Sequence, residues 1–249
     1  MTGAGRGRGR GRGAARATLG LAVAFAASTG CGGSKSDATG ARPARAGAVA
    51  AATGASPTDG GSPRVLFLGT SLTAGLGLDP DSAYPQRIQR LADSAGLRFE
   101  VVNAGVSGET SAGLLRRLDW VLRQPARVIV VETGANDGLR GQSVKATRAT
   151  IGQVLDRIQR DRPDATLVLA QMEAPTNLGR EYTAAFHAMF PSLAREKGAT
   201  LLPFLLDGVA GRPALNQADG VHPNDEGERI VTRNVWRALE PVLRRAAGR

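Results

Sequence analysis

Short apolar runs that alternate with amphipathic stretches constrain the fold of this chain more than any other feature. Five runs rich in Val, Ile and Leu have the length of buried strands: residues 65–68, 99–102, 128–131, 166–170 and 200–204. Stretches with apolar side chains at helical spacing lie between and after them, at residues 84–95, 110–123, 143–160, 181–197 and 225–247. Such alternation predicts an α/β fold with a mostly parallel five-stranded sheet and helices on both faces.

The alternation begins only at residue 64, and the chain before it has a different composition. Residues 1–16 are rich in Arg and lack acids, residues 18–27 are small and apolar, and Cys31 follows three small residues. This is the order of a secretory signal, and its apolar run is shorter than the roughly 20 residues that span a bilayer. We expect a signal sequence over residues 1–31, a flexible Gly-, Ala- and Pro-rich tether over residues 32–63 and one folded domain over residues 64–249.

Cys31 is the only cysteine, so no intrachain disulfide is possible. Its setting resembles a bacterial lipoprotein box, although Ser28 stands where Leu or Val is usual. Cleavage before Cys31 would leave it N-terminal and lipidated, which predicts an exported, periplasmic or cell-surface protein anchored to a membrane. Cleavage to a soluble exported form is an alternative. A disordered RNA-binding arm is a second alternative, and the apolar run argues against it.

The net charge of +10 is concentrated at the N-terminus. Eight of the 32 basic and two of the 22 acidic residues lie before residue 64, which leaves the domain with a net charge of +4. The domain's Arg residues are mixed with acids along the expected helices, as on solvated helix faces. Aromatic residues make up 4% of the chain, too few for base-stacking platforms. We therefore expect no nucleic-acid partner.

Polar and small residues follow four of the five expected strands. Ser71 follows the first strand, residues 103–108 the second, Asn136 the third, and Asp219 with His222 the fifth. Because ligands of parallel sheets bind at the carboxyl ends of the strands, we expect these residues to meet at one edge of the sheet.

A serine hydroxyl needs a base within hydrogen-bond reach, and that base needs an orienting acceptor. The chain has two histidines. His222 lies three residues after Asp219, so one turn can present both side chains to Ser71. His187 lies off the expected inward stripe of its helix and is expected on the surface; that stripe comprises Tyr182, Ala185, Phe186, Met189 and Leu193.

Acyl transfer also needs donors for the developing oxyanion. The backbone N–H groups of Ser71 and Gly105 and the side-chain amide of Asn136 are the candidates. The order Ser, Asp, His occurs in other strand-turn-helix hydrolases. The Gly-x-Ser-x-Gly elbow is absent, because Thr73 stands two residues after Ser71.

Taken together, these segments resemble the SGNH (GDSL) hydrolases. The resemblance rests on residues 69–72 (GTSL), Gly105, residues 134–137 (GAND) and the pair Asp219 and His222, in that order. Residues 134–141 (GANDGLRG), 174–182 (APTNLGREY) and 201–204 (LLPF) look like the periplasmic thioesterase I, lysophospholipase and arylesterase branch.

The resemblance implies a flavodoxin-like three-layer α/β/α sandwich that hydrolyses esters or thioesters without a metal or cofactor. It implies Ser71 as nucleophile, His222 as base, Asp219 as its orienter, and Ser71, Gly105 and Asn136 as oxyanion donors. It also implies an acyl pocket lined by Glu173, Ala174, Pro175, Thr176, Asn177, Leu178 and Gly179. Thr70 departs from the family's Gly-Asp-Ser-Leu block and supplies no negative charge.

Two other functions stay open. A small-acyl carbohydrate deacetylase would have the same fold and triad, and only its acyl-chain preference would differ. A surface lipoprotein that binds acyl ligands without turnover is the other, and Thr70 alone favours it. We expect a monomer that acts on a small acyl ester or thioester.

Overall fold

A single five-stranded sheet forms the centre of the domain. The computed structural model describes residues 61–248. The strands are β1 (Arg64–Gly69), β2 (Glu100–Gly105), β3 (Val128–Val131), β4 (Thr166–Gln171) and β5 (Thr200–Phe204). Their order is β2-β1-β3-β4-β5 and all four pairings are parallel. The order reverses between β1 and β3, so the crevice at the carboxyl ends of these two strands is where a ligand is expected.

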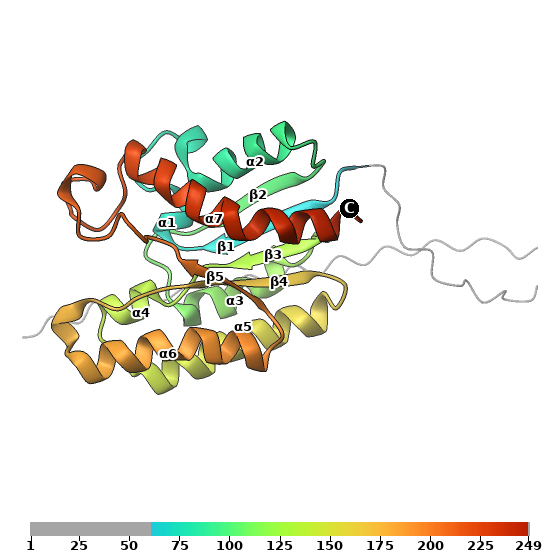
Figure 1. Cartoon of the computed structure of the whole chain (residues 1–249). Helices are drawn as coiled ribbons and strands as arrows, with labels where there is room; N and C mark the ends of the chain where they lie inside the picture. Colours follow the sequence, from blue (N-terminus) through green and yellow to red (C-terminus); the bar gives the residue numbers. More distant parts are fainter. Residues whose placement is uncertain (1–60, 249) are drawn as a thin grey trace, which may run out of the picture. The chain divides into compact units, whose positions relative to one another are not determined.

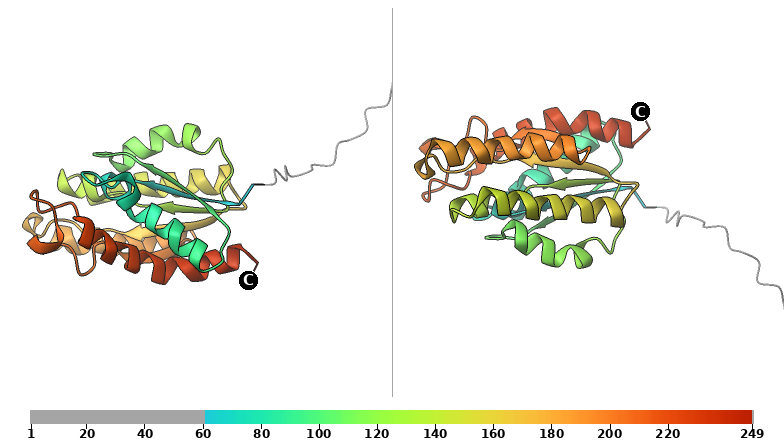
Figure 2. Two further views of the ribbon diagram at one scale, coloured as in Figure 1. Left: turned by 90° about the horizontal axis from the view of Figure 1, so that it is seen from above. Right: turned by 90° about the horizontal axis from the view of Figure 1, so that it is seen from below.

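Helices cover both faces of this sheet (Figures 1 and 2). On one face α2 (Tyr84–Ser94) packs against α7 (Asp225–Ala246), and on the other α3 (Ser111–Val121), α5 (Val144–Asp161) and α6 (Arg180–Glu196) lie side by side. Short helices α1 (Ser71–Ala74) and α4 (Ala135–Leu139) and 3-10 turns η1 (Pro80–Ser82), η2 (Thr176–Leu178) and η3 (Pro213–Leu215) complete the domain. The α/β/α architecture predicted from the alternation is confirmed.

The central strands β1, β3 and β4 are apolar along most of their length because both of their faces are covered, whereas the edge strands β2 and β5 are partly accessible. β3 is buried throughout, and only the first residue of β1 and of β4 is partly accessible. The amphipathic helices turn one stripe inward, such as Ile151, Val154, Leu155 and Ile158 of α5. Burying these stripes on the sheet forms one continuous core.

The observed elements differ from the sequence prediction in two places that matter. Strand β2 continues to Gly105 instead of ending at Val102, because it pairs with β1 along its whole length, as far as Gly69. The buried stripe of α6 uses Phe190, whereas Ala185 is exposed. The buried face of α6 comprises residues at helical spacing: Phe186, Met189, Phe190 and Leu193. The expected stripe was therefore wrong at one position, because it included Ala185 and left out Phe190.

The expected signal sequence, Cys31 and almost all of the expected tether lie outside the described residues 61–248. Within residues 61–248, no helix has both the length and the apolar character needed to cross a membrane.

Candidate active site

Ser71 stands at the turn that follows β1. The strand ends at Gly69, Thr70 has extended backbone angles, and Ser71 is the first residue of α1. Gly75 ends this one-turn helix with a φ of 71°, a left-handed conformation that glycine adopts without strain. The abrupt change from strand to helix places Ser71 at the carboxyl edge of the sheet.

The loop before α7 brings a histidine and an aspartate to this serine. His222 Nε2 lies 2.8 Å from Ser71 Oγ, and His222 Nδ1 lies 2.6 Å from Asp219 Oδ2. An Nδ1–H that donates to the carboxylate leaves Nε2 able to accept the serine proton. The three side chains predicted to meet at the strand ends therefore lie in one hydrogen-bonded chain.

Asp219 is held by its own loop. Its Oδ1 accepts the backbone N–H groups of Val221 (2.9 Å) and His222 (3.0 Å). These bonds and the His222 side chain lower the pKa of Asp219 to about 2, with the His222 backbone N–H as the largest cause. The carboxylate therefore stays charged at neutral pH and keeps the imidazole oriented.

Gln217 also belongs to this loop, and it fixes the position of the loop against the turn that carries Ser71. The Gln217 backbone N–H donates to His222 O at 2.7 Å. Its side-chain Nε2 donates to Leu76 O (2.7 Å) and to Pro223 O (2.9 Å). Because Leu76 lies just beyond α1, Gln217 ties the histidine loop to the serine turn. Its role was not anticipated from the sequence.

Asn136 lies at the start of α4, and one of its two amide hydrogens is donated to a backbone carbonyl of the loop before α3. Asn136 Nδ2 donates to Glu109 O at 2.9 Å. The second amide hydrogen remains for a ligand, because a carboxamide has two donors. Asn136 and Ser71 line the same cavity, as expected for an oxyanion donor beside its nucleophile.

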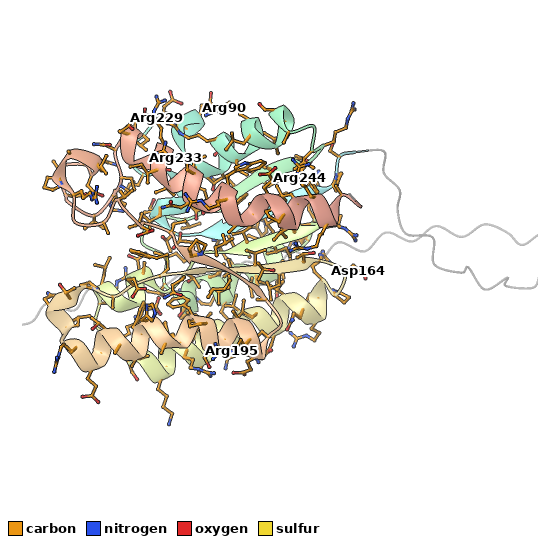
Figure 3. All side chains as sticks on the ribbon, in the orientation of Figure 1. Arg90, Asp164, Arg195, Arg229, Arg233 and Arg244 are labelled. Atoms are coloured by element: carbon orange, nitrogen blue, oxygen red, sulfur yellow. The ribbon has the colours of Figure 1, made fainter. Side chains whose placement is uncertain are left out.

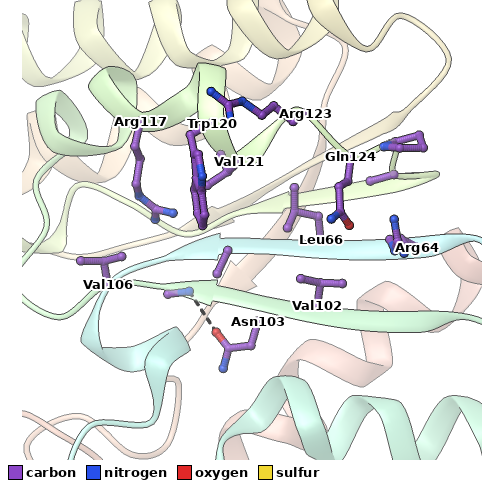
Figure 4. Close-up of a pocket in the computed structure, with 14 residues that line it drawn as sticks. Arg64, Leu66, Val102, Asn103, Val106, Arg117, Trp120, Val121, Arg123 and Gln124 are labelled. Atoms are coloured by element: carbon purple, nitrogen blue, oxygen red, sulfur yellow. Dashed lines mark hydrogen bonds between the residues drawn. The ribbon is translucent and has the colours of Figure 1, made fainter.

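The structure corrects the expectation for Gly105. Its N–H donates to Asn103 Oδ1 at 3.0 Å, so it is already satisfied within the protein (Figure 4). Gly105 lines a different hollow, of about 560 Å³, which Trp120 also lines. It has no side chain because a Cβ there would lie 2.4 Å from Ala74 N. Gly105 thus allows close packing of β2 against α1 and does not line the Ser71 cavity.

In the segment that joins β2 to α3, Gly108 is the glycine that lines the Ser71 cavity. It has a φ of 76°, and its N–H has no hydrogen-bond partner among residues 61–248. Arg140 Nη2 donates to Gly108 O at 3.0 Å and so holds the carbonyl of this residue in place. Ending the second strand at Val102 placed Gly105 in the loop, whereas the strand pairs with β1 as far as Gly105 and the loop begins after it.

The Ser71 cavity has a volume of about 650 Å³, the size of a typical small-molecule site. Apolar side chains from several loops line it: Leu72, Leu76, Leu139, Met172, Phe204, Leu206 and Val221. Four of the seven residues expected to line an acyl pocket do so: Glu173, Ala174, Pro175 and Thr176. Asn177, Leu178 and Gly179 lie outside its lining, since η2 leads the chain away.

His187 lies where the sequence predicted, on the exposed side of α6. Its Nδ1 lies 2.7 Å from Glu173 Oε1 and 2.8 Å from Gln171 Nε2. It does not line the Ser71 cavity. Within residues 61–248 there is no group of three His, Cys, Asp or Glu side chains that could hold a metal ion.

A further residue that the sequence analysis missed is Glu132, which follows β3. Thr70 donates to its carboxylate through both the backbone N–H (2.7 Å) and Oγ1 (2.9 Å). Thr70, which stands where the family block has an acid, thus contacts a carboxyl group that follows a neighbouring strand. Sixty-two residues separate this pair, so no local pattern could have identified it.

Basic side chains are spread over the outer faces of the helices. Figure 3 shows Arg90 on α2, Arg195 on α6 and Arg229 on α7 directed away from the sheet. Many pair with acids, as Arg229 does with Asp225 at 3.0 Å. This mixture matches the solvated helix faces expected from the sequence.

Comparison with known proteins shows the family to which the chain is related. Residues 67–230 match the GDSL-like Lipase/Acylhydrolase family. The chain is 35% identical over 181 residues to Esterase TesA of Pseudomonas aeruginosa, covering 72% of this chain and 89% of that protein. It is 37% identical over 180 residues to Thioesterase 1/protease 1/lysophospholipase L1 of Escherichia coli strain K12, covering 72% and 84%. A crystal structure of TesA superposes with a TM-score of 0.69 at 33% identity, covering 72% of this chain and 99% of that one.

Proposed function

The chain belongs to the GDSL-like lipase/acylhydrolase family and is a hydrolase of ester bonds, and on that premise we propose that Ser71 is its nucleophile. His222 is the general base and Asp219 orients it. The N–H groups of Ser71 and Gly108 and the Asn136 amide stabilise the oxyanion. The observation that carries the proposal is the hydrogen-bonded chain from Ser71 Oγ through His222 to Asp219.

In the first half of the reaction, Ser71 Oγ attacks the carbonyl carbon while His222 Nε2 takes the hydroxyl proton. The carbonyl oxygen becomes negatively charged and is held by the donors of Gly108 and Asn136. The bond from carbon to the leaving oxygen or sulfur then breaks. His222 returns its proton to that atom, and the acyl group stays on Ser71.

In the second half, water replaces the leaving group. His222 accepts a proton from the water as its oxygen attacks the acyl carbon. When the second tetrahedral intermediate collapses, the bond to Ser71 Oγ breaks and His222 protonates that oxygen. The products are a carboxylic acid and an enzyme in its starting state.

The size and lining of the cavity favour aryl or lipid-like acyl groups over acetyl groups. Leu72, Met172 and Phe204 surround a volume of about 650 Å³ beside Ser71. An acetyl group would leave most of this apolar volume to water, whereas a longer acyl chain would remove apolar surface from water. A carbohydrate deacetylase is therefore the second candidate.

Hydrolysis of p-nitrophenyl esters from acetyl to palmitoyl by the full chain tests this proposal, with Ser71→Ala as the matched control. We expect turnover that rises from acetyl towards medium or long chains and is lost in Ser71→Ala. A maximum at acetyl would favour the deacetylase. No turnover by the folded protein on any ester would contradict the function and favour a protein that only binds acyl ligands.

We also propose that the protein is exported, acts as a monomer and is anchored by a lipid at Cys31. The support is the order of basic, apolar and small residues before Cys31 in the sequence. Replacing Cys31 by Ser should release the exported protein from the membrane fraction of the expressing bacterium. A Cys31→Ser protein that is exported and stays with the membranes would contradict the anchor.

A further inference from the structure

A buried carboxyl that takes no part in the proposed reaction lies directly behind the nucleophile turn. Glu132 is the residue after β3, and none of its surface is exposed. Its backbone N–H donates to Leu68 O at 2.8 Å, which places it beside the end of β1. Among residues 61–248 no basic side chain forms an ion pair with it. A buried carboxylate without a cation requires hydrogen-bond donors.

The donors all come from the two threonines that flank Ser71 and Leu72. Thr70 donates through its N–H to Oε2 (2.7 Å) and through Oγ1 to Oε2 (2.9 Å) and Oε1 (3.0 Å). Thr73 Oγ1 donates to Oε2 at 2.9 Å. Tyr84 OH lies 2.8 Å from Thr73 Oγ1, and as donor it directs the threonine proton to Glu132. The whole network therefore converges on one carboxylate.

This arrangement replaces the usual cap of a helix. An N-cap threonine ordinarily accepts a backbone N–H from the second or third residue of its helix. Thr70 is the N-cap of α1, yet its side chain makes no such bond. The carboxylate of Glu132 interacts instead with the backbone N–H of Thr73, the third residue of α1. Glu132 thus caps α1 from the neighbouring strand, and the Thr70 hydroxyl is directed to the same carboxylate.

Gly69 leaves the space that this contact requires. A Cβ at Gly69 would lie 1.9 Å from Thr73 Oγ1 and 2.8 Å from Glu132 Oε2. Any larger residue would push the threonine and the carboxylate apart. The glycine of the motif is therefore part of the same arrangement.

We propose that Glu132 is a positioning residue for catalysis: its carboxylate fixes the Thr70 peptide and caps α1, and so sets the orientation of the Ser71 N–H and Oγ. It touches neither substrate nor reacting atoms. The inference rests on the proposed function, since it assigns Glu132 to the support of that nucleophile.

The electrostatic surroundings agree with this geometry. Burial raises the pKa of Glu132, and the donors from Thr70 and Thr73 oppose the rise. Burial also raises the pKa of Tyr84 well above its usual value, and the Glu132 charge adds to this effect. Tyr84 therefore stays a neutral donor. A second buried carboxyl, Glu228, interacts with the backbone N–H of Tyr84.

Glu132→Gln in the full chain tests the proposal because glutamine keeps the shape and removes the charge. Since a small misplacement of a catalytic group is costly, we expect kcat on p-nitrophenyl butyrate to fall about tenfold or more. KM should stay within about twofold, because the substrate contacts are unchanged. The rate of Ser71 labelling by a fluorophosphonate should fall with kcat. A purely structural role would lower the melting temperature and leave kcat per folded molecule unchanged.

Two further comparisons keep the test decisive. Thr70→Val should lower kcat, and Thr70→Ser, which restores the hydroxyl, should recover it. Glu228→Gln removes the other buried carboxyl, which does not contact the nucleophile turn, and should leave kcat within about twofold.

Three results would overturn the proposal: a Glu132→Gln protein with the kcat of the original chain, Thr70→Val as active as Thr70→Ser, or an equal loss in Glu228→Gln. If Glu132→Gln fails to fold, the Thr70 pair decides. If the original chain shows no turnover that depends on Ser71, the proposed function itself is refuted. This result is distinct from the three above, which refute only the role of Glu132.

Discussion

At the residue scale, Asn136 combines two tasks in one amide group. One of its hydrogens is fixed by Glu109 O at 2.9 Å, and in the proposed reaction the other binds the oxyanion. The Glu109 carboxylate is in turn held by Arg117 Nη2 at 2.7 Å. An oxyanion donor that is oriented before the substrate arrives does not have to reorganise during the reaction.

We expect Asn136→Ala to lower kcat by about 10²–10³, the usual cost of losing one oxyanion donor. KM and the melting temperature should change little, because Asn136 is only half-buried and its lost partner is a single backbone carbonyl. Steady-state kinetics and thermal melting measure both. Asn177→Ala is the matched control, since this amide lies outside the cavity. Full activity of Asn136→Ala would remove Asn136 from the reaction.

The sequence predicted some of these residues and missed others for a physical reason. Ser71, Asn136 and the pair Asp219 and His222 could be found because each follows a strand, and parallel strands end at one edge. The choice of Gly105 failed because it depended on where β2 ends, and strand ends are the least certain part of a sequence-based prediction. Glu132 follows a fully apolar strand, and no local sequence pattern indicated its contact with Thr70.

At the scale of elements, the first turn of α7 contains an acid in an unusual place. Glu228 is buried, and its Oε2 has no hydrogen-bond partner among residues 61–248. Burial raises its pKa to about 8. The folded protein therefore binds this proton more tightly than the unfolded chain does, and stability is lost as pH rises from the unfolded pKa towards the folded one.

Between about pH 4.5 and pH 8 we expect the Glu228 carboxyl to lower the free energy of unfolding by a few kcal/mol, at about 1.4 kcal/mol per pKa unit. Glu228→Gln should remove this slope and stabilise the protein above pH 8. Urea denaturation at several pH values measures it. Glu226→Gln, an exposed acid of the same helical turn, is the control. Parallel pH profiles for Glu228→Gln and the original chain would show that Glu228 is not protonated in the fold.

The elements themselves were the most predictable feature of the chain. Strands β3 and β5 begin and end where the apolar runs do, at Val128–Val131 and Thr200–Phe204. The expected buried stripe of α6 included Ala185 and left out Phe190, because both positions fit a helical spacing. The folded protein buries Phe190, whose ring removes more apolar surface from water than the methyl group of Ala185.

At the scale of the whole domain, three exposed apolar side chains lie around the Ser71 cavity. Leu76, Leu139 and Val221 are 44%, 51% and 41% exposed and all line that cavity. They come from the loop after α1, from α4 and from the histidine loop, so three separate segments converge on one apolar rim. An apolar rim of this kind can guide an acyl chain towards Ser71.

Leu139→Ser should therefore lower kcat/KM for octanoyl and longer p-nitrophenyl esters by several-fold to about tenfold, and leave the acetyl ester nearly unchanged. The reason is that only long chains reach the rim and lose apolar contact. Trp120→Ser is the matched control, because Trp120 is 66% exposed and lies at the other hollow. An equal loss for all chain lengths would mean that Leu139 supports the fold near Asn136 and does not contact the acyl chain.

The most direct measurement for the central claim is mass spectrometry of the full chain after reaction with a fluorophosphonate. This reagent leaves a stable adduct only on a serine that an adjacent base has activated. We predict one adduct per molecule, mapped to the peptide that contains Ser71, and none in His222→Ala or Ser71→Ala. A folded protein that takes up no label, or that is labelled at another residue, would contradict the assignment of Ser71 as the nucleophile.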